Sequence, residues 1–315
     1  MYLCMGCMEE FDDSLDTCPH CGYKRGTPPK EAYHLPPETI LNKRFIVGRV
    51  LDFNEYSITY IGWDGAQKRA VSIQEFFPPS LAHRVPGQKE AAVEEKSQRV
   101  FLEHRRRFLE KDTLWLALQG MPGAFQTLHI FFENATAYIV REYFAHSSSL
   151  KAEILKAGCM PHFEKATEIL APVMEALCVL HRAGLVHRDI NPACILLTEH
   201  GAKLFPTGCV THMGKGRGIV LSPGFSAPEM YRSRTKVTAS ADVYGICAVL
   251  YYMLTGQIPP ESVDRLQHDT LRPSTELRAC GAQDTVLQHG MALRQKERIQ
   301  TMEELLEAFR LHGNT

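Results

Sequence analysis

The alternation of apolar and polar residues predicts strands in the first half of the chain and helices in the second. Residues Phe45 to Tyr60 are rich in β-branched and aromatic side chains, which indicates two strands joined by a turn, and Ala70 to Phe77 indicates a third strand. Helical spacing of apolar residues is clearest in Phe163 to His181 and in Met302 to Leu311. The longest apolar run, Tyr244 to Leu254, predicts a helix that is too short to cross a bilayer.

The composition is that of a globular chain without a strong charge bias. Of the 315 residues, 44% are hydrophobic and 23% are charged, which is enough to bury a sizeable core, and the formal net charge is −1. A chain without excess positive charge is not expected to bind nucleic acid or anionic membranes nonspecifically. No signal peptide is apparent, and we therefore expect a cytoplasmic protein without a membrane span.

Four cysteines at the N-terminus form two Cys-x-x-Cys pairs, Cys4 with Cys7 and Cys18 with Cys21. Four thiolates in this arrangement suit tetrahedral Zn²⁺. Residues 1–25 contain too few apolar side chains to form a core unaided, so a bound metal would hold the segment together. Disulfides or a redox-active pair are the alternatives, and both are uncommon as structural features in a reducing compartment.

Four further motifs follow one another in the order and at the spacing found in protein kinases. They are His187-Arg188-Asp189, Ala227-Pro228-Glu229, Asp242 at the head of an apolar helix, and Arg298 near the C-terminus. Together they resemble the catalytic loop, the end of the activation loop, the buried central helix, and the arginine that pairs with the Ala-Pro-Glu carboxylate in the protein kinase superfamily, in particular bacterial Ser/Thr protein kinases. The resemblance implies an α+β, bilobal protein-kinase-like fold with a small N-terminal zinc ribbon.

The resemblance also implies the domain boundaries. Residues 1–25 would form the zinc ribbon, similar to ribbons on some bacterial kinase-like proteins, and residues 26–40 a proline-containing linker. Residues 41–315 would form the protein-kinase-like domain, with an N lobe of about 41–143 and a C lobe of about 144–315. Because the linker separates ribbon and body, we expect the body to remain folded when the ribbon is removed.

The positions that organise the lower lobe are retained. By resemblance, Asp189 is the base that accepts the proton of the substrate hydroxyl, and Arg188 and Asp242 organise the loop around it. Glu229 and Arg298 would pair as buried ions below that loop. Because the other reactive groups are replaced, the resemblance implies that Asp189 is a vestigial base.

The positions that handle ATP and its metal ions are replaced. By the same resemblance, Gln74 stands in place of the lysine that contacts the α- and β-phosphates, and Asn191 in place of the lysine that contacts the transferred phosphate. Cys194 and Pro206 stand in place of the asparagine and aspartate that hold Mg²⁺. Sulfur is a poor ligand for a hard cation and proline offers none, so we do not expect ATP or Mg²⁺ as cofactors.

Two more parts of the expected nucleotide site differ. The turn Leu51 to Ser57 contains no glycine, although the backbone there would have to approach phosphates closely. Lys111 falls where the family's helix carries the glutamate that pairs with the strand lysine. Glu110 is one residue away, about 100° around the helix, and could replace that glutamate only if the helix turned or the alignment shifted by one residue.

Arg141 falls at the gatekeeper position before the hinge, where the family usually has an apolar or small side chain. A guanidinium there needs an acid or water, and it would crowd the adenine pocket or occupy the space left by the missing lysine. Glu55, Glu75 and Glu110 are candidate partners, among which the sequence does not choose.

The sequence therefore predicts a pseudokinase, a signalling or scaffolding protein that uses a kinase fold to bind protein partners and carries a structural Zn²⁺. One alternative is an unorthodox active Ser/Thr protein kinase that transfers phosphate from ATP. A second is a zinc-ribbon recognition module on a kinase-like support. Five acidic residues between Glu9 and Asp16 outnumber the two basic residues Lys24 and Arg25, which favours a protein over a nucleic acid as the ribbon's partner.

Overall fold

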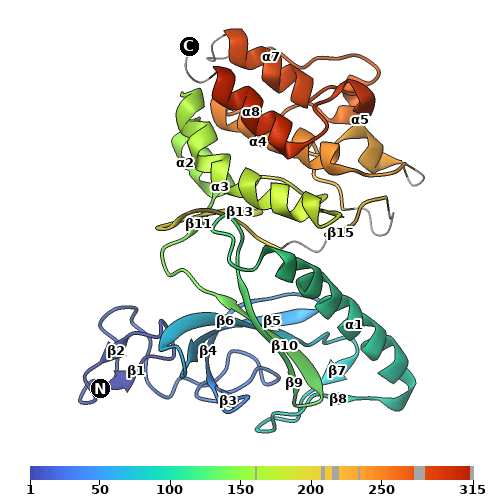
Figure 1. The fold of residues 1–315 in the computed structure, drawn as a ribbon. Helices are drawn as coiled ribbons and strands as arrows, with labels where there is room; N and C mark the ends of the chain where they lie inside the picture. The colour runs from blue at the N-terminus through green and yellow to red at the C-terminus, as the bar shows by residue number, and fades with distance from the viewer. Residues whose placement is uncertain (160–161, 207–209, 215–219, 233–234, 273–280, 313–315) are drawn as a thin grey trace. The chain divides into compact units, whose positions relative to one another are not determined.

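The computed structural model describes residues 1–159, 162–206, 210–214, 220–232, 235–272 and 281–312 (Figure 1). The chain divides into two compact units. The first contains Met1–Thr113 and Gln126–Ala145, and the second contains Leu114–Phe125 and His146–Thr315. Each unit encloses a hydrophobic core of its own.

A six-stranded antiparallel sheet forms the body of the first unit. Its strands are β3 (Ile40–Leu41), β4 (Phe45–Phe53), β5 (Ser57–Asp64), β6 (Arg69–Phe76), β9 (Thr127–Glu133) and β10 (Thr136–Glu142). They lie in the order β3-β4-β5-β6-β10-β9 (Figure 1). The three strands predicted from residue pattern are confirmed as the neighbours β4, β5 and β6.

Strand β6 shows how the sequence determines the two faces of this sheet. Val71 and Ile73 are buried, whereas the alternate residues Ala70, Ser72 and Gln74 are half-buried. Successive side chains of a strand point to opposite faces of the sheet. Helix α1 (Gln98–Trp115) follows the short strands β7 (Ala82–His83) and β8 (Ala92–Val93) and the 3₁₀ turn η1 (Glu95–Ser97). Phe101 of α1 packs on Phe76 of β6, with ring centroids 5.1 Å apart, and so joins the helix to the core of the sheet.

The N-terminal segment belongs to the same compact unit as the sheet. Its strands β1 (Tyr2–Leu3) and β2 (Glu10–Phe11) pair with each other. In the segment that we expected to be a linker, Tyr33 stacks on Phe77 at 5.7 Å, and the Leu35 amide donates a hydrogen bond of 3.0 Å to the Tyr60 hydroxyl. This part of the segment therefore packs against the sheet and is not a free spacer.

The second unit is mainly helical. Its helices are α2 (Leu150–Ala157), α3 (Phe163–Arg182), α4 (Ala239–Thr255), α5 (Ser262–Arg265), α7 (Gly281–Gly290) and α8 (Met302–His312). Shorter elements are η2 (Leu116–Leu118), β11 (Ser148–Ser149), β12 (Leu185–Val186), β13 (Ile195–Thr198), β14 (Gly201–Leu204), β15 (Thr211–His212), η3 (Pro228–Tyr231) and η4 (Gln295–Glu297). The helices predicted from apolar spacing are confirmed as α3 and α8.

Helix α4 is the centre of the second core. All of its residues from Ala239 to Leu254 are buried, which explains why its sequence is apolar on every side. It ends at Gly256, which has φ of 69° and whose amide bonds to the Tyr252 carbonyl, a left-handed conformation that glycine adopts without a steric penalty. Its one carboxylate, Asp242 in the first turn, is buried as well.

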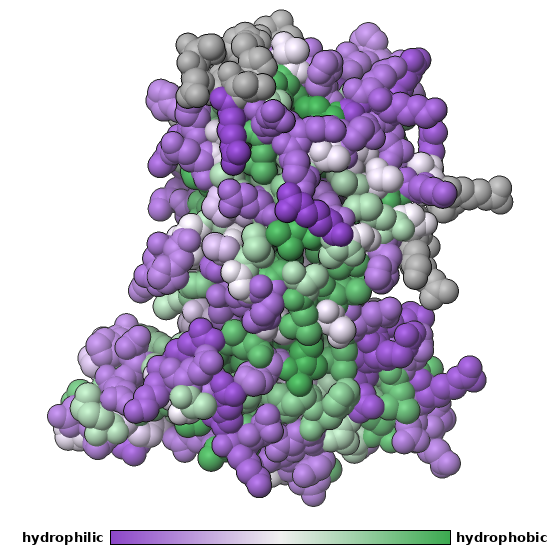
Figure 2. Space-filling model, in the orientation of Figure 1, coloured by the Kyte–Doolittle hydropathy of each residue, from purple (hydrophilic) through white to green (hydrophobic). Residues whose placement is uncertain are grey.

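On the face that Figure 2 shows, hydrophilic side chains cover much of the surface, with apolar side chains between them. Among the described residues, no helix combines the length and the apolar character needed to cross a membrane.

Candidate functional site

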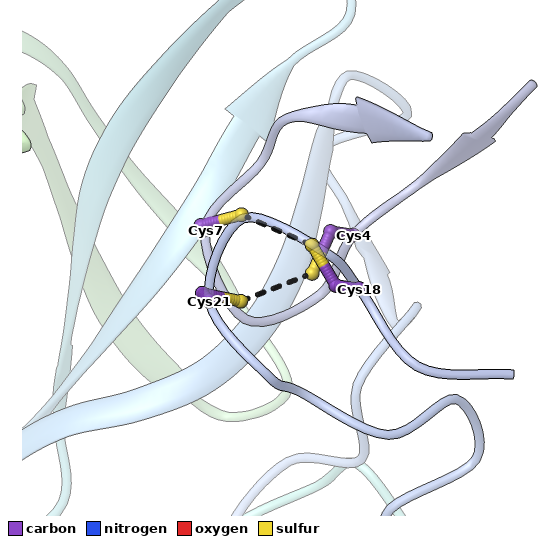
Figure 3. Close-up of side chains that lie close together, drawn as sticks. All are labelled: Cys4, Cys7, Cys18 and Cys21. Carbon is purple, nitrogen blue, oxygen red and sulfur yellow. Dashed lines mark hydrogen bonds between the residues drawn. The ribbon is translucent and has the colours of Figure 1, made fainter. Parts of the chain in front are cut away.

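The four N-terminal cysteines converge on one point (Figure 3). The ligand atoms of Cys4, Cys7, Cys18 and Cys21 all lie within 4.8 Å of one another. Cys4 and Cys21 have Sγ atoms 3.6 Å apart, those of Cys7 and Cys18 are 3.8 Å apart, and all four thiols are free. Tetrahedral Zn–S bonds of about 2.3 Å require sulfur–sulfur separations of about 3.8 Å. The cluster can therefore hold one metal ion.

Short backbone turns place these thiols. The Gly6 amide donates to Cys4 Sγ at 3.3 Å, and the Gly22 amide donates to the Cys18 carbonyl at 2.9 Å. Gly22 has φ of 72°, where any other residue except asparagine or aspartate would be strained. Burial raises the pKa of the Cys4 thiol to about 11 and also raises the pKa of Cys7. A bound cation would offset that penalty by stabilising the thiolates.

The turn between β4 and β5 is closed by a side chain. Asn54 Oδ1 accepts hydrogen bonds from the backbone amides of Tyr56 at 2.9 Å and Ser57 at 3.0 Å. An asparagine at this place mimics a backbone turn, so the hairpin needs no glycine. The turn is an ordinary polar hairpin in its local geometry.

A continuous polar network occupies the positions around Gln74. Gln74 donates from Nε2 to Ser57 Oγ at 2.8 Å, and its Oε1 accepts from an Arg141 guanidinium nitrogen at 2.8 Å. Arg141 also donates to Asp112 of α1 from Nε at 3.1 Å and from Nη2 to both carboxylate oxygens at 2.8 Å. The Arg141 and Asp112 side chains are only 7% and 5% exposed, so this is a buried, bidentate ion pair.

Asp112 was not among the partners predicted for Arg141 from the sequence. It follows Phe108 by four residues and precedes Trp115 by three, so an acid on the apolar stripe of this helix was the signal that could have revealed it. The three acids considered for Arg141 lie elsewhere. Glu55 is exposed, and Glu110 is exposed with its carboxylate 3.8 Å from Arg106.

Glu75, the third candidate, belongs to a different buried network. Arg84 donates to its carboxylate, and the hydroxyls of Tyr60 and Tyr138 donate to it at 3.0 Å and 2.8 Å. Burial raises the pKa of Glu75 despite these partners. The backbone of Lys111 lies in α1, but its side chain falls outside the described part of the structure.

In the second unit, the His187-Arg188-Asp189 loop is held by Asp242 of α4. The Asp242 carboxylate accepts hydrogen bonds from the amides of His187 and Arg188, both at 2.8 Å, and its Oδ2 lies 2.8 Å from His181 Nε2. These contacts lower the pKa of Asp242, although burial alone would raise it. Arg188 has φ of 68°, a strained conformation that the two hydrogen-bonded amides maintain.

Asp189 is oriented by two uncharged groups. Asn191 Nδ2 and Ser222 Oγ each donate to Asp189 Oδ1 at 2.8 Å, and these two donors are themselves 3.2 Å apart. The amide of Asn191 occupies the space next to the carboxylate without bringing a charge. The site thus has an oriented carboxylate with a neutral neighbour, Asn191, at the position that the resemblance assigns to a lysine in the family.

The two side chains that, by the resemblance, replace the family's Mg²⁺ ligands do not fit that ion. Cys194 is 3% exposed, and its Sγ lies 3.0 Å from the Asn191 carbonyl oxygen and 3.3 Å from that of Asp189. Burial raises the pKa of this thiol far above its usual range, so it stays neutral. Pro206 offers no side-chain ligand, and the residues after it, 207–209, fall outside the described residues. A hard cation would find neither charge nor oxygen from these two side chains.

Glu229 and Arg298 lie together as the resemblance implied. Arg298 donates to the two Glu229 oxygens at 2.6 Å and 3.1 Å, and also to the carbonyls of Ser240 and Ala292, each at 3.0 Å. The two side chains are 0% and 4% exposed, so the pair is fully withdrawn from water. It ties η3, the head of α4 and the segment before α8 to one another.

Comparison with known proteins identifies the class of the chain. Residues 92–310 match the protein kinase domain family, and the chain belongs to that family. The matched range begins after β6, so the cysteine cluster and the first four strands of the sheet lie outside it.

Two proteins to which the chain is similar are named as Ser/Thr protein kinases. The chain is 30% identical over 184 residues to the probable serine/threonine-protein kinase zyg-1 of Caenorhabditis elegans, covering 54% of this chain and 26% of that one. It is 30% identical over 192 residues to the serine/threonine-protein kinase PknB of Mycobacterium leprae, covering 56% and 30% of the two chains. The chain thus spans less than a third of either relative.

Solved kinase structures share the fold. The structure titled PpkA-294 apo form superposes with a TM-score of 0.70 at 26% identity, covering 88% of this chain and 99% of that one. The PknI kinase domain of Mycobacterium tuberculosis, at 19% identity, has a TM-score of 0.62 over 88% of this chain and 99% of its own, which supports the fold alone. The kinase-like fold with mixed helix and sheet is therefore established, and the cysteine cluster is consistent with a small metal-binding module.

Proposed function

We propose that this protein is a pseudokinase that works by binding a protein partner and does not transfer phosphate. The observation that carries the proposal is the network at Gln74. The side chain in the lysine position is an amide, and both of its ends are already hydrogen-bonded, to Ser57 and to Arg141. The cation in that network, Arg141, is paired with Asp112 by three hydrogen bonds. It would have to give up a buried partner to reach a phosphate.

The second unit supports the same proposal. Phosphoryl transfer depends on positioning and on cations that stabilise developing negative charge. Asn191 is neutral, Cys194 is a buried thiol and Pro206 has no ligand atom. An oriented carboxylate such as Asp189 contributes to rate only when nucleotide and substrate are bound beside it.

A nucleotide-binding measurement tests the proposal. We expect no rise in melting temperature with Mg·ATP and no labelled phosphate on the protein or on generic acceptors. A Mg·ATP-dependent rise that disappears in an Asp189→Asn variant would overturn it. As a control, Gln74→Lys, Cys194→Asn and Pro206→Asp combined should still not restore binding, because Arg141 and the glycine-free turn remain.

The second candidate function is that of an active Ser/Thr protein kinase. Two observations favour it: the relatives are Ser/Thr kinases, and Asp189 keeps a hydrogen bond from a hydroxyl, Ser222. This candidate needs a cation and oxygen ligands from positions other than Gln74, Cys194 and Pro206. The measurement above separates the two candidates.

We also propose that Cys4, Cys7, Cys18 and Cys21 bind a structural Zn²⁺. The sulfur separations support it, and so does the small core of this segment, which consists of Cys4, Cys18 and Phe11 with three partly buried neighbours. Metal analysis of protein purified in reductant without added metal should give about one zinc per chain. Paired disulfides and no metal under those conditions would refute the site.

Four free thiols so close together favour a reducing compartment, and we propose that the protein works in the cytoplasm. The exposed acids of the N-terminal segment, including Glu9, Glu10, Asp12 and Asp16, support a protein partner over a nucleic acid. Electrophoretic mobility shift with mixed DNA and RNA should show no complex at physiological salt. A complex under those conditions would favour the zinc-ribbon recognition module as the working part.

A further inference from the structure

The turn that carries the first two cysteines is also the part of the N-terminal segment that touches the sheet. Met5 and Gly6 lie between Cys4 and Cys7, and Met8 follows directly. The Met5 carbonyl accepts a hydrogen bond of 2.8 Å from the Arg49 amide, and the Gly6 carbonyl accepts one of 2.7 Å from Arg49 Nε. The same five residues therefore present two metal ligands and hold the edge of β4.

Apolar contacts reinforce these hydrogen bonds. Met5 and Met8 are 4% and 2% exposed and form a buried cluster with Ile61 of β5, which is 0% exposed. Partly buried neighbours complete the cluster: Leu3, Tyr23, Ile46, Leu51, Trp63, Ala70 and Tyr143. Removing these apolar side chains from water stabilises the docked turn. We call this contact surface, formed by Gly48 and Ile61 under Met5 and Met8, the seat.

Gly48 of β4 makes the close approach possible. A Cβ on this residue would lie 2.5 Å from the Met5 carbonyl oxygen and 2.2 Å from Met8 Cε. Any larger side chain would push the cysteine-bearing turn away from the strand. Gly48 is far in sequence from the four cysteines, yet its missing side chain leaves the space that the Cys4–Met8 turn occupies on β4.

The seat also completes the edge of the sheet. Along β4, the Val47 amide bonds to the Thr39 carbonyl at 2.8 Å, and two residues later the Arg49 amide bonds to Met5. The turn therefore pairs the edge at the point where the preceding segment stops, which protects an otherwise open strand. Its apolar cluster includes Ala70, which lies on the same face of β6 as Ser72 and Gln74.

We propose that the cysteine cluster is a metal-dependent clamp: metal binding and the docking of the N-terminal segment on β4 and β5 are one coupled equilibrium. With metal bound, the Cys4–Met8 turn has the shape that fits Gly48 and Ile61. When metal is lost, the turn loses its shape, the Arg49 amide loses its acceptor, and the face around Ile61 and Trp63 is uncovered. The clamp rests on the proposed metal site.

Coupling of this kind must act in both directions. Removing the metal should release the turn, and blocking the seat should weaken metal binding although all four thiols are intact. This reciprocity distinguishes a clamp from a ribbon that merely happens to lie near the sheet.

Hydrogen exchange at two amides of one strand measures the first direction in the full-length protein. Adding a strong zinc chelator should speed exchange at the Arg49 amide by at least about tenfold, within the usual range of coupling between sites. The Val47 amide, on the same edge but bonded to Thr39, is the internal control and should change far less. The paired variant Cys4→Ser/Cys7→Ser should reproduce the chelated pattern without chelator.

A glycine substitution measures the second direction. Gly48→Ala should weaken Zn²⁺ binding by at least about tenfold in competition with a metal indicator. Gly65→Ala is the matched control, because its Cβ would meet only the Arg44 carbonyl oxygen at 3.1 Å, away from the seat. If wild-type protein binds zinc but Arg49 and Val47 respond alike to chelation, the clamp is refuted and the metal site stands. If wild-type protein binds no zinc, both fail.

Discussion

At the residue scale, the structure places the cation beside Gln74 on strand β10, at Arg141. The family resemblance places a lysine on the strand now carrying Gln74, whereas the cation is Arg141 on β10, and it pairs with Asp112 of α1. An ion pair therefore joins the sheet to α1 through β10. Because Arg141 lies against Gln74, a second cation at position 74 would meet like charge in a buried place.

This arrangement predicts a compensating pair of substitutions. Arg141→Met should destabilise the protein by about 3–5 kcal/mol, because it leaves Asp112 buried without a partner. Gln74→Lys alone should also destabilise, since it adds an ammonium beside Arg141. The double variant should be more stable than Arg141→Met alone by about 0.5–3 kcal/mol, because the introduced ammonium would pair with Asp112. Urea unfolding of the four proteins measures the coupling, and purely additive effects would contradict it.

Residues that belong to short motifs were predictable from the sequence. Interaction partners that lie outside any motif were not. Asp189, Asp242 and Arg298 were located by short patterns with fixed neighbours. Asp112 was not, because assigning it requires the rotation of α1 relative to β10, which no local pattern records. Likewise, Arg84 and Glu75 are nine residues apart in sequence. That spacing does not predict the buried ion pair that they form, or the hydrogen bonds that Glu75 accepts from Tyr60 and Tyr138.

At the element scale, strands and helices with strong periodicity were predictable, whereas the packing of the N-terminal segment was not. The contacts of Met5 with Arg49 and of Leu35 with Tyr60 join residues far apart in sequence, and none of these four positions belongs to a pattern that predicts its partner. Proline-rich composition favoured a spacer, but the buried Leu35 and the stacked Tyr33 outweigh that tendency through tertiary contact.

The loop anchored on α4 predicts a pH dependence. Burial lowers the pKa of His187 below its ordinary value, and its Nδ1 accepts from the Asp189 amide at 3.4 Å, which requires a neutral ring. Below about pH 6.5 the unfolded state therefore binds a proton that the folded state does not, and stability must fall as pH falls. The lowered pKa of Asp242 adds to the loss at still lower pH.

Thermal unfolding between pH 7.5 and 5 measures this dependence, a range of about one to two units on either side of the ordinary histidine pKa. A His187→Gln variant keeps a donor and an acceptor but cannot titrate, so its melting temperature should fall less steeply over the same range. Equal slopes for the two proteins would show that His187 does not contribute.

At the scale of the whole molecule, each unit has a separate hydrophobic core and a tryptophan of its own. Trp63 lies in the cluster under the Cys4–Met8 turn, and Trp115 is buried in the core of the second unit. The cysteine cluster and the Glu229–Arg298 pair likewise lie in different units. Stability of the two units should therefore respond to different perturbations.

Single-tryptophan variants make this prediction measurable. In a Trp115→Phe protein, chelation should lower the temperature at which Trp63 fluorescence changes. In a Trp63→Phe protein, Glu229→Gln should destabilise the transition reported by Trp115 by about 3–5 kcal/mol, because Arg298 is left buried without its carboxylate. Each perturbation should leave the other reporter nearly unchanged, since neither core shares the affected contacts. One transition that shifts equally under both perturbations would instead mean that the chain unfolds as a single cooperative body, with metal occupancy stabilising the helical unit as strongly as the sheet.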